Sequence, residues 1–428
     1  MIIGCIISWS RLIGLNENVP PQIRYKQESF KEAELQNYFQ DDCVTELENS
    51  IKDLSKDLPQ NTAVFYPILF DDRIELLLTL RQGKQIQTQR FAPQQPITKA
   101  YLEQEIRNFL SEVRRLEKLK EMAPNEMLEE LGDFTIDEYR QNLLNQLLPD
   151  AKRLYQWLIE PIANTLETSQ VKTLIIVPDD ILRTVPFAAL HNGKNFLIKE
   201  KYALAVTPGL KLTELKKMPR RIKALLNGLS EKIAGYDKLN AEEELDNISE
   251  VLTNSHRLES KNFTISKVNT QLEKNAYSIV HFATHGHFDK NPNDTYLLTY
   301  DAHPNNDKPE KRLRMDCLAA LMEVAEFRDK PVELLTFSAC ETALGDERAS
   351  LGLAGVAVKV GVRSALATLW AVDDNATKLL LTEFYQQLGK TASKAEALQQ
   401  AQKTILAKYE EYQHPYYWAA FLLIGNWL

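Results

Sequence analysis

The sequence has little cysteine: there are four in 428 residues, and no two lie close enough to form a CxxC pair. Four dispersed cysteines exclude a disulfide framework, and the missing CxxC spacing argues against a short metal-binding or redox motif. We therefore expect a reducing compartment and mostly free thiols, one of which is available as a nucleophile.

Long apolar runs and an excess of basic charge are also missing. The apolar start at 1–7 is followed by Ser8, Ser10 and Arg11, whereas a membrane-spanning helix needs about 20 apolar residues. A secretory signal carries its positive charge ahead of the apolar stretch, not after it. With 51 basic against 59 acidic residues, the chain lacks the positive surface that nucleic-acid binding requires. These absences predict a cytoplasmic protein without a membrane or nucleic-acid partner, whose first residues form a strand or a packing segment.

Nucleotide-binding motifs and internal repeats are absent as well. There is no Gly-Lys-Ser/Thr and no GxGxxG, so neither a P-loop nor a dinucleotide site is expected. Gly352, Gly355 and Gly361 are better explained by close packing of a helix on a sheet. No repeat of about 34 or 40 residues is visible, which excludes a helical repeat array within this chain.

What is present is the composition of a soluble globular protein, 44% hydrophobic and 26% charged, at a length that suits two or three domains. Residues 1–165 form the first predicted domain, a three-stranded meander followed by helices, which we expect to regulate the rest of the chain or to recruit a partner. The predicted strands lie at 63–70, 73–80 and 85–91. Apolar residues at helical spacing predict helices over 98–166, with a connection at 122–132 and a break at Pro149.

Residues 166–428 form the second predicted domain. Short apolar runs alternate there with amphipathic helical segments, which is typical of parallel strands buried on both faces. The sequence therefore predicts an α/β fold with a mostly parallel sheet flanked by helices. The predicted strands lie at 174–177, 222–229, 263–268, 278–282, 332–337 and 363–369. The predicted helices lie at 241–255, 350–360, 375–387 and 394–408.

Three histidines crowd the end of the predicted strand 278–282. In open α/β sheets, catalytic groups gather just beyond the carboxyl ends of the strands. His281 lies within the strand and is expected to be packed and hydrogen-bonded, whereas His285 follows the strand and His287 could contact a substrate. Gly286 would let a substrate carbonyl approach the backbone and would leave an amide free to donate to it.

Cys340 follows the apolar run 332–337 in the same way. Adjacent strands would bring it beside His285, and a thiolate next to an imidazole is the reactive form of a cysteine. A cysteine that ends an apolar strand is more often inert core, so the histidine partner decides the interpretation. Ala339-Cys340 matches the pair in the caspase signature, but Glu341 and Thr342 depart from the rest of it.

With these motifs, roughly residues 165–428 resemble the CHAT-domain peptidases, bacterial relatives of caspases and separases. The resemblance rests on VHFATHG (280–286), FSACETA (337–343) and ATLWAVDD (367–374), with further matches at 175–180, 185–190 and 417–425. It implies a caspase-like fold and a cysteine endopeptidase that needs no cofactor and no metal. It also implies that His285 is the base, Cys340 the nucleophile, and the amides of Gly286 and Cys340 the oxyanion hole.

The resemblance to separases implies a substrate preference. There the acid that matches Asp374 lines the pocket for an arginine side chain, and such a carboxylate selects a basic P1 residue through a charge-assisted hydrogen bond. Asp373 is the alternative, and either acid could instead cap the following helix. Asp180, beyond another strand end, could line the same cleft, although a turn or cap is its simpler role. The expected partners are a protein substrate and a regulatory protein.

Two other interpretations stay open. THGHFD (284–289) fits the first part of the metallo-β-lactamase signature and could build a metal-dependent hydrolase, but Lys290 stands where that signature has a histidine. Only His303 and His414 remain downstream as further ligands. The other interpretation is a catalytically inactive scaffold with a caspase-like fold, against which the presence of both His285 and Cys340 argues.

Overall fold

The computed structural model describes most of the chain from residue 18 onward. The described ranges are 18–39, 57–83, 85–122, 124–132, 134–233, 235–289, 291–302, 312–326, 331–338, 341–342, 352 and 355–428. Cys340 and the start at 1–17 lie outside them, so the strand or packing segment expected at 1–7 is not described. No helix within these ranges is both long enough and apolar enough to cross a membrane.

The chain folds into two compact units, each built from more than one stretch of sequence. Unit 1 comprises residues 1–30, 53–204 and 402–420, and unit 2 comprises residues 31–52, 205–401 and 421–428. The division at residue 165, made from a change in periodicity, stays a prediction.

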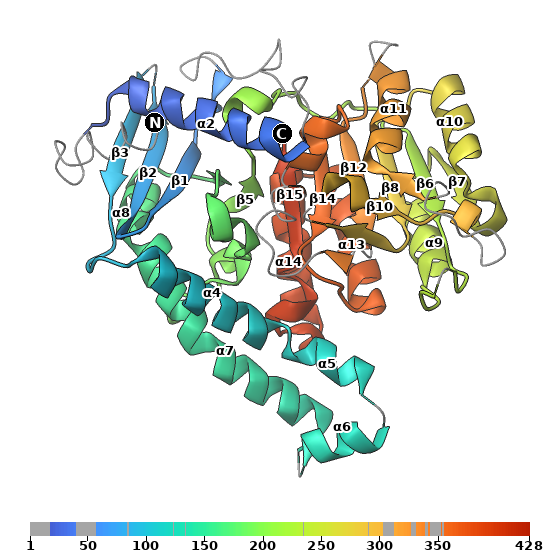
Figure 1. The fold of residues 1–428 in the computed structure, drawn as a ribbon, viewed down its shortest axis with the longest axis horizontal. Coiled ribbons are helices and arrows are strands. Elements are labelled where there is room, and N and C mark those ends of the chain that lie inside the picture. The colour runs from blue at the N-terminus through green and yellow to red at the C-terminus, as the bar shows by residue number, and fades with distance from the viewer. Residues whose placement is uncertain are drawn as a thin grey trace. The chain divides into compact units, whose positions relative to one another are not determined.

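Unit 1 contains the predicted meander, which is confirmed. Its strands are β1 (Thr62–Phe70), β2 (Arg73–Gln82), β3 (Gln85–Phe91) and β4 (Thr173–Ile176). β2 pairs antiparallel with β1 and β3, and β4 joins β1 in parallel (Figure 1). Glu75, a buried acid within β2, is held by Arg73 at 2.8 Å and by Arg90 at 2.7 Å, so its charge is paired.

The helices of unit 1 differ from the prediction in two places. They are α4 (Lys99–Val113), α5 (Arg115–Glu121), α6 (Pro124–Leu131), α7 (Ile136–Leu158) and α8 (Glu160–Thr168). The segment expected to be a connection contains the helix α6, and α7 continues through Pro149 instead of breaking there. Pro149 is exposed, while Leu147 and Ala151 beside it are fully buried, so tertiary packing outweighs the hydrogen bond that proline removes.

His414 is a buried helix cap in unit 1. It is 2% exposed, and its Nδ1 accepts a hydrogen bond from the Tyr416 amide at 3.2 Å. Burial lowers the pKa of His414 to about 3, far below its ordinary value of 6.5.

We expect this histidine to make the protein acid-sensitive. Below pH 6.5 the unfolded chain binds a proton at His414 that the folded chain does not bind until about pH 3. Stability should therefore fall with pH below 6.5, by about 2 kcal/mol at pH 5. His414→Asn keeps the cap but cannot titrate, so denaturant unfolding from pH 7 to 5 should show a shallower loss for this variant. Equal slopes for both proteins would contradict the assignment.

Unit 2 holds the predicted parallel sheet. Its strands are β6 (Ala224–Gly228), β7 (Ser255–Glu259), β8 (Ile279–Ala283), β12 (Leu334–Ser338), β14 (Ser364–Thr368) and β15 (Phe421–Gly425). Their order is β15-β14-β12-β8-β6-β7, parallel throughout except for β15, which runs antiparallel to β14. Val206 of β5 (Ala203–Val206) pairs in parallel with Ile424 of β15.

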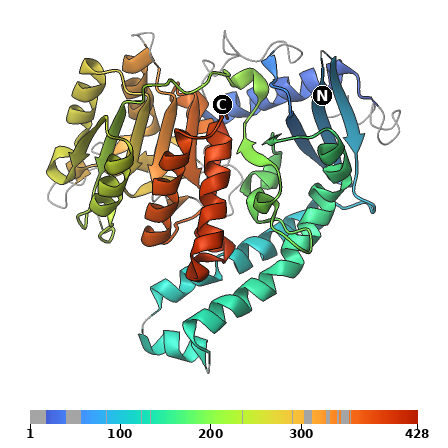
Figure 2. The same cartoon turned by 180° about the vertical axis from the view of Figure 1, so that it is seen from behind.

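Helices cover both faces of this sheet (Figures 1 and 2). They include α9 (Ala241–Val251), α10 (Ile265–Lys274), α11 (Met315–Glu326), α13 (Asp374–Leu388) and α14 (Lys394–Lys408). The connection from β6 to β7 moves toward one edge of the sheet. The connections from β7 to β8 and from β8 to β12 move toward the other edge. Because crossovers are right-handed, α9 lies on one face and α10 and α11 on the opposite face. In agreement, α9 packs against α13 and α10 against α11.

The strand predicted at 263–268 is wrong, because the helix α10 begins there. Thr264 is its N-cap and accepts a hydrogen bond from the Lys267 amide, while Val268 and Leu272 are buried at helical spacing. The edge strand β7 was not predicted, since Leu258 is its only fully buried side chain and the others are polar.

Beyond the carboxyl ends of β8 and β12 the chain forms a second, small sheet. Its strands are β11 (Leu313–Arg314), β10 (Tyr296–Leu297), β9 (Gly286–Phe288) and β13 (Glu341–Thr342). β9 runs antiparallel to β10 and parallel to β13. β8 and β12 are paired in the large sheet, and β9 and β13, which follow them in the chain, are paired in the small one.

Two of the three glycines after the small sheet pack against a helix, not against the sheet as predicted. From residue 31 on, α2 (Pro21–Phe39) belongs to unit 2. A Cβ added at Gly352 would collide with Tyr38 Oη, and one at Gly355 would also collide with α2. The expected close packing exists, but its partner is α2. Gly361 instead has a φ of +67°, a left-handed conformation that suits the end of a helix.

We expect Gly355→Ala to destabilise unit 2. The new Cβ would lie 2.6 Å from Leu35 Cδ2 and 2.9 Å from Phe39 Cε2, both in a buried cluster. Overpacking of this kind costs about 1–3 kcal/mol, more than the helix propensity that alanine gains. Gly389→Ala is the matched control, because nothing lies within 4 Å of its added Cβ. Thermal unfolding should show a lower Tm for the first variant alone, and a Tm unchanged by Gly355→Ala would refute the packing.

Candidate active site

The two strands that precede the predicted catalytic residues end side by side. β8 and β12 are parallel neighbours, as predicted, and their last paired residues are Ala283 and Ser338. His285 follows Ala283 by two positions, and Cys340 follows Ser338 by two positions.

The chain pairs again immediately afterwards. In the small sheet, Glu341 of β13 lies opposite His287 of β9. The described residues on both sides of Cys340 are therefore paired with the residues on both sides of His285, although Cys340 itself lies outside the described residues.

His285 is held by a backbone carbonyl. Its Nε2 lies 2.8 Å from the Asp237 carbonyl oxygen, and its ring lies 4.8 Å from the Tyr236 ring. A carbonyl oxygen can only accept a hydrogen bond, so this contact requires a proton on Nε2. In a neutral imidazole the other ring nitrogen, Nδ1, then carries the lone pair that can accept a proton. Lys232, 2.8 Å from the Asp237 carboxylate, lowers the pKa of that acid, and His285 adds a smaller effect in the same direction. The ring is thus oriented with one basic nitrogen.

The Gly286 amide faces β13. Successive amides of a strand point to opposite edges, and the Leu298 amide donates to the His285 carbonyl at 2.9 Å from the β10 side. The N–H of Gly286 therefore points to the other edge of β9, where Glu341 pairs.

His287 and Asp289 form a separate pair. Nε2 of His287 lies 3.3 Å from Asp289 Oδ2, and its side chain is 35% exposed. Tyr38 of α2 donates to the Asp289 carbonyl at 2.8 Å, which ties α2 to the segment after β9. His285 and His287 thus have different partners, and the described residues hold no group of three His, Cys, Asp or Glu side chains suited to a metal ion. The metal-dependent interpretation gains no support from this geometry.

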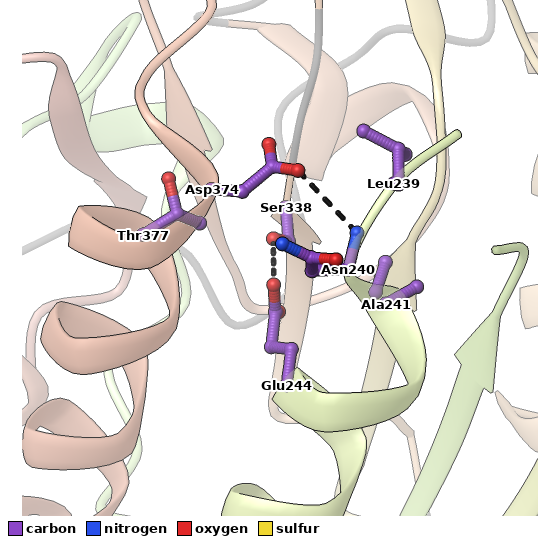
Figure 3. Close-up of a pocket in the computed structure, with 8 residues that line it drawn as sticks. Leu239, Asn240, Ala241, Glu244, Ser338, Asp374 and Thr377 are labelled. Carbon is purple, nitrogen blue, oxygen red and sulfur yellow. Dashed lines mark hydrogen bonds between the residues drawn. The ribbon is translucent and has the colours of Figure 1, made fainter. Parts of the chain in front are cut away.

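A small hollow lies at the carboxyl ends of β8 and β12 (Figure 3). It is lined by Leu239, Asn240, Ala241, Glu244, Ala283, Ser338, Asp374 and Thr377. Asp374 lines it because β14 pairs with β12 and α13 begins after β14. Oδ2 of Asp374 accepts a hydrogen bond from the Asn240 amide at 3.3 Å. A carboxylate therefore lines a hollow that Ser338, two residues before Cys340, also lines.

The other two acids named as candidates have different surroundings. Asp373 is the N-cap of α13, and its carboxylate accepts from the amides of Asn375 and Ala376 at 3.0 and 3.1 Å. Asp180 belongs to unit 1 and forms an ion pair with Lys99.

Glu244, a buried acid of α9 that was not predicted from the sequence, also lines the hollow. It is 6% exposed, its Oε1 lies 2.9 Å from His281 Nε2, and its Oε2 accepts from Ser338 Oγ at 2.7 Å (Figure 3). In sequence it looks like one of three acids at a helix start. A better signal was available: Glu244 lies three residues after Ala241 and four before Ile248, on the apolar face of the helix.

His281 is packed and hydrogen-bonded, as predicted. It is fully buried, and its Nδ1 lies 3.1 Å from the hydroxyl of Tyr385 in α13. That hydroxyl donates to Thr336 Oγ1 of β12 at 2.8 Å, and burial raises the pKa of Tyr385. A buried polar chain thus runs from Thr336 through Tyr385, His281 and Glu244 to Ser338, so that both ends lie on β12.

Comparison with known proteins identifies the family of this chain. The CHAT domain matches residues 148–426, which is more than half of the sequence, and the chain belongs to this family. Tetratricopeptide repeat protein 28 of Homo sapiens is 24% identical over 329 residues, covering 65% of this chain, and that of Mus musculus is 25% identical over 338 residues, covering 67%. The chain spans only 13% and 14% of the length of these relatives. Both are mammalian, so a bacterial source stays a prediction.

The fold is similar to that of a solved protein complex. The separase–securin complex of Saccharomyces cerevisiae superposes with a TM-score of 0.53 at 11% sequence identity. The match covers 87% of this chain and 30% of the separase chain. The predicted fold class, a caspase-like and mostly parallel α/β sheet flanked by helices, is confirmed.

Proposed function

We propose that this chain is a cysteine endopeptidase in which Cys340 is the nucleophile and His285 the base. The observation that carries the proposal is the double pairing around both residues: Ala283 with Ser338 before them, and His287 with Glu341 after them. This pairing supports the proposal because it brings together the chain segments that carry the two residues. The names of the mammalian relatives describe repeats and not an activity, so the proposal does not rest on them.

Each residue has a defined task in this reaction. The Cys340 thiol gives its proton to Nδ1 of His285, and the resulting thiolate attacks the carbonyl carbon of the substrate. The amides of Gly286 and Cys340 donate hydrogen bonds to the oxyanion. The Gly286 N–H supports this role because it points toward the edge of β9 that pairs with β13. His285 then protonates the leaving amine, and water hydrolyses the acyl-enzyme. The Asp237 carbonyl keeps the ring in the required tautomer throughout.

We further propose that Asp374, at the hollow beside Ser338, contacts the P1 side chain and selects a basic residue. The support is Asp374, whose carboxylate lines the hollow near the strand end that leads to Cys340. A partly buried carboxylate attracts Arg or Lys and repels Asp or Glu. His287 lies on β9 as an additional substrate contact, and Asp180, being paired with Lys99, is the weakest of the candidates. The partners are then a protein substrate and, through residues 1–165, a regulatory protein.

Mapping of new protein termini tests the function without knowledge of the substrate. The full chain and its Cys340→Ala variant are incubated with a cell extract, with and without a chelator, and new amino termini are read by mass spectrometry. We expect a few new termini that follow Arg or Lys, that appear only with the wild type, and that the chelator does not change. Equal termini with both proteins would reject the peptidase and favour the scaffold, and loss of cleavage with the chelator alone would favour the metal-dependent hydrolase.

A further inference from the structure

Glu244 is an acid that α9 carries into the interior of unit 2. A carboxylate loses its hydration when it is buried, so it needs partners for both oxygens. Both are supplied here, by His281 at 2.9 Å and by Ser338 at 2.7 Å. The neighbouring Glu243 shows the contrast: its side chain is 59% exposed and forms an ion pair with Lys378 at 2.6 Å.

The two contacts fix Glu244 in one orientation. His281 is itself held from the other side by Tyr385, which is bonded to Thr336 of β12. His281, Thr336 and Ser338 are at most 1% exposed, so water does not compete for these hydrogen bonds. The carboxylate is therefore a rigid acceptor, and the Ser338 hydroxyl has a fixed partner.

Ser338 is the last residue of β12, and Cys340 follows it by two positions. The next described residue of the chain, Glu341, is paired in the small sheet. The hydrogen bond from Ser338 to Glu244 is thus the last side-chain anchor in the described residues before the nucleophile. We infer that Glu244 is a positioning residue of the proposed reaction, which holds the end of β12 through Ser338 and thereby sets the place of the Cys340 thiol. This inference rests on the proposed function.

A positioning role predicts a specific pattern of kinetics. Ser338→Ala and Glu244→Ala should each lower kcat roughly tenfold to a hundredfold with little change in KM, because a misplaced nucleophile affects the chemical step. Since both act through one hydrogen bond, the double variant should be no slower than the slower single variant. Glu244→Gln keeps an acceptor for Ser338 and can donate to His281, so it should restore most of the rate. Glu243→Gln is the matched control and should keep the wild-type rate.

Alkylation of Cys340 provides a readout that does not depend on peptidase activity. The rate of modification by iodoacetamide, followed at Cys340 by peptide mass spectrometry, should fall in the two alanine variants and recover in Glu244→Gln. Thermal unfolding identifies any variant that fails to fold, and Ser338→Ala, which removes one oxygen, is the least disruptive of them.

The inference is overturned if folded Ser338→Ala keeps the wild-type kcat and alkylation rate, if the two alanine effects multiply, or if Glu244→Gln is as slow as Glu244→Ala. Failure of the proposed function looks different: Cys340→Ala would then cleave as well as the wild type, while the alkylation rates would still report whether Glu244 places the thiol.

Discussion

Cys340→Ala is expected to abolish peptide cleavage, with kcat reduced at least about a thousandfold. The thiolate is the group that forms the covalent intermediate, and alanine has nothing to replace it. The free energy of unfolding should change little, because the change removes a single atom. Fluorogenic peptide hydrolysis by the full chain, with thermal unfolding of the same samples, measures both quantities.

His285→Ala should give a loss of roughly a hundredfold to ten-thousandfold, because the thiol then has no base to accept its proton. Cys317→Ala is the matched control for both variants: it removes an exposed cysteine outside the candidate site and should keep the wild-type rate. Wild-type cleavage by Cys340→Ala, or an equal loss with Cys317→Ala, would contradict the assignment of the nucleophile.

Asp374→Asn is expected to remove the preference for a basic P1 residue. Loss of one partner from a buried charge pair commonly costs about 2–5 kcal/mol, which corresponds to tens- to thousands-fold in rate. The wild type should prefer Arg or Lys in a peptide panel that varies only P1. The variant should lose that preference, while its rate on peptides with an uncharged P1 residue should stay that of the wild type.

Asp373→Asn is the control at the neighbouring position. Asn is as good an N-cap as Asp, so the hydrogen bonds to Asn375 and Ala376 are kept and the P1 preference should stay. A wild-type preference for Asp at P1, or the same selectivity in Asp374→Asn and the wild type, would contradict the role proposed for Asp374.

Much of the fold follows from local patterns in the sequence. The meander is marked by turn pairs, and β8, β12 and β14 are marked by short, largely apolar runs that alternate with helical segments. Where the predicted elements or contacts differ from the structure, long-range packing explains the difference. Pro149 stays within α7 because its buried neighbours hold the helix, and the glycines at 352 and 355 meet α2, more than 300 residues earlier in the chain.

The candidate site could be predicted only in part. His285 stands out because a histidine and a glycine follow an apolar strand, and Asp374 because it precedes a helix beyond a strand end. The contact of His285 with the Asp237 carbonyl could not be predicted, since every residue has a backbone carbonyl. Glu244 was hidden among three adjacent acids, and only the helical periodicity of α9 sets it apart.

The most direct test of the central claim is the reactivity of Cys340 beside His285. Peptide-resolved rates of iodoacetamide alkylation are measured near neutral pH for Cys340 and Cys317 in the wild type and in His285→Ala. Partial desolvation of the exposed Cys317 thiol, and to a smaller extent Asp316, raises its pKa, so Cys317 reports a thiol without activation. We expect Cys340 to react at least about ten times faster than Cys317 and to lose this advantage in His285→Ala, because only the thiolate reacts. Equal rates at both cysteines, unaffected by the loss of His285, would contradict the account.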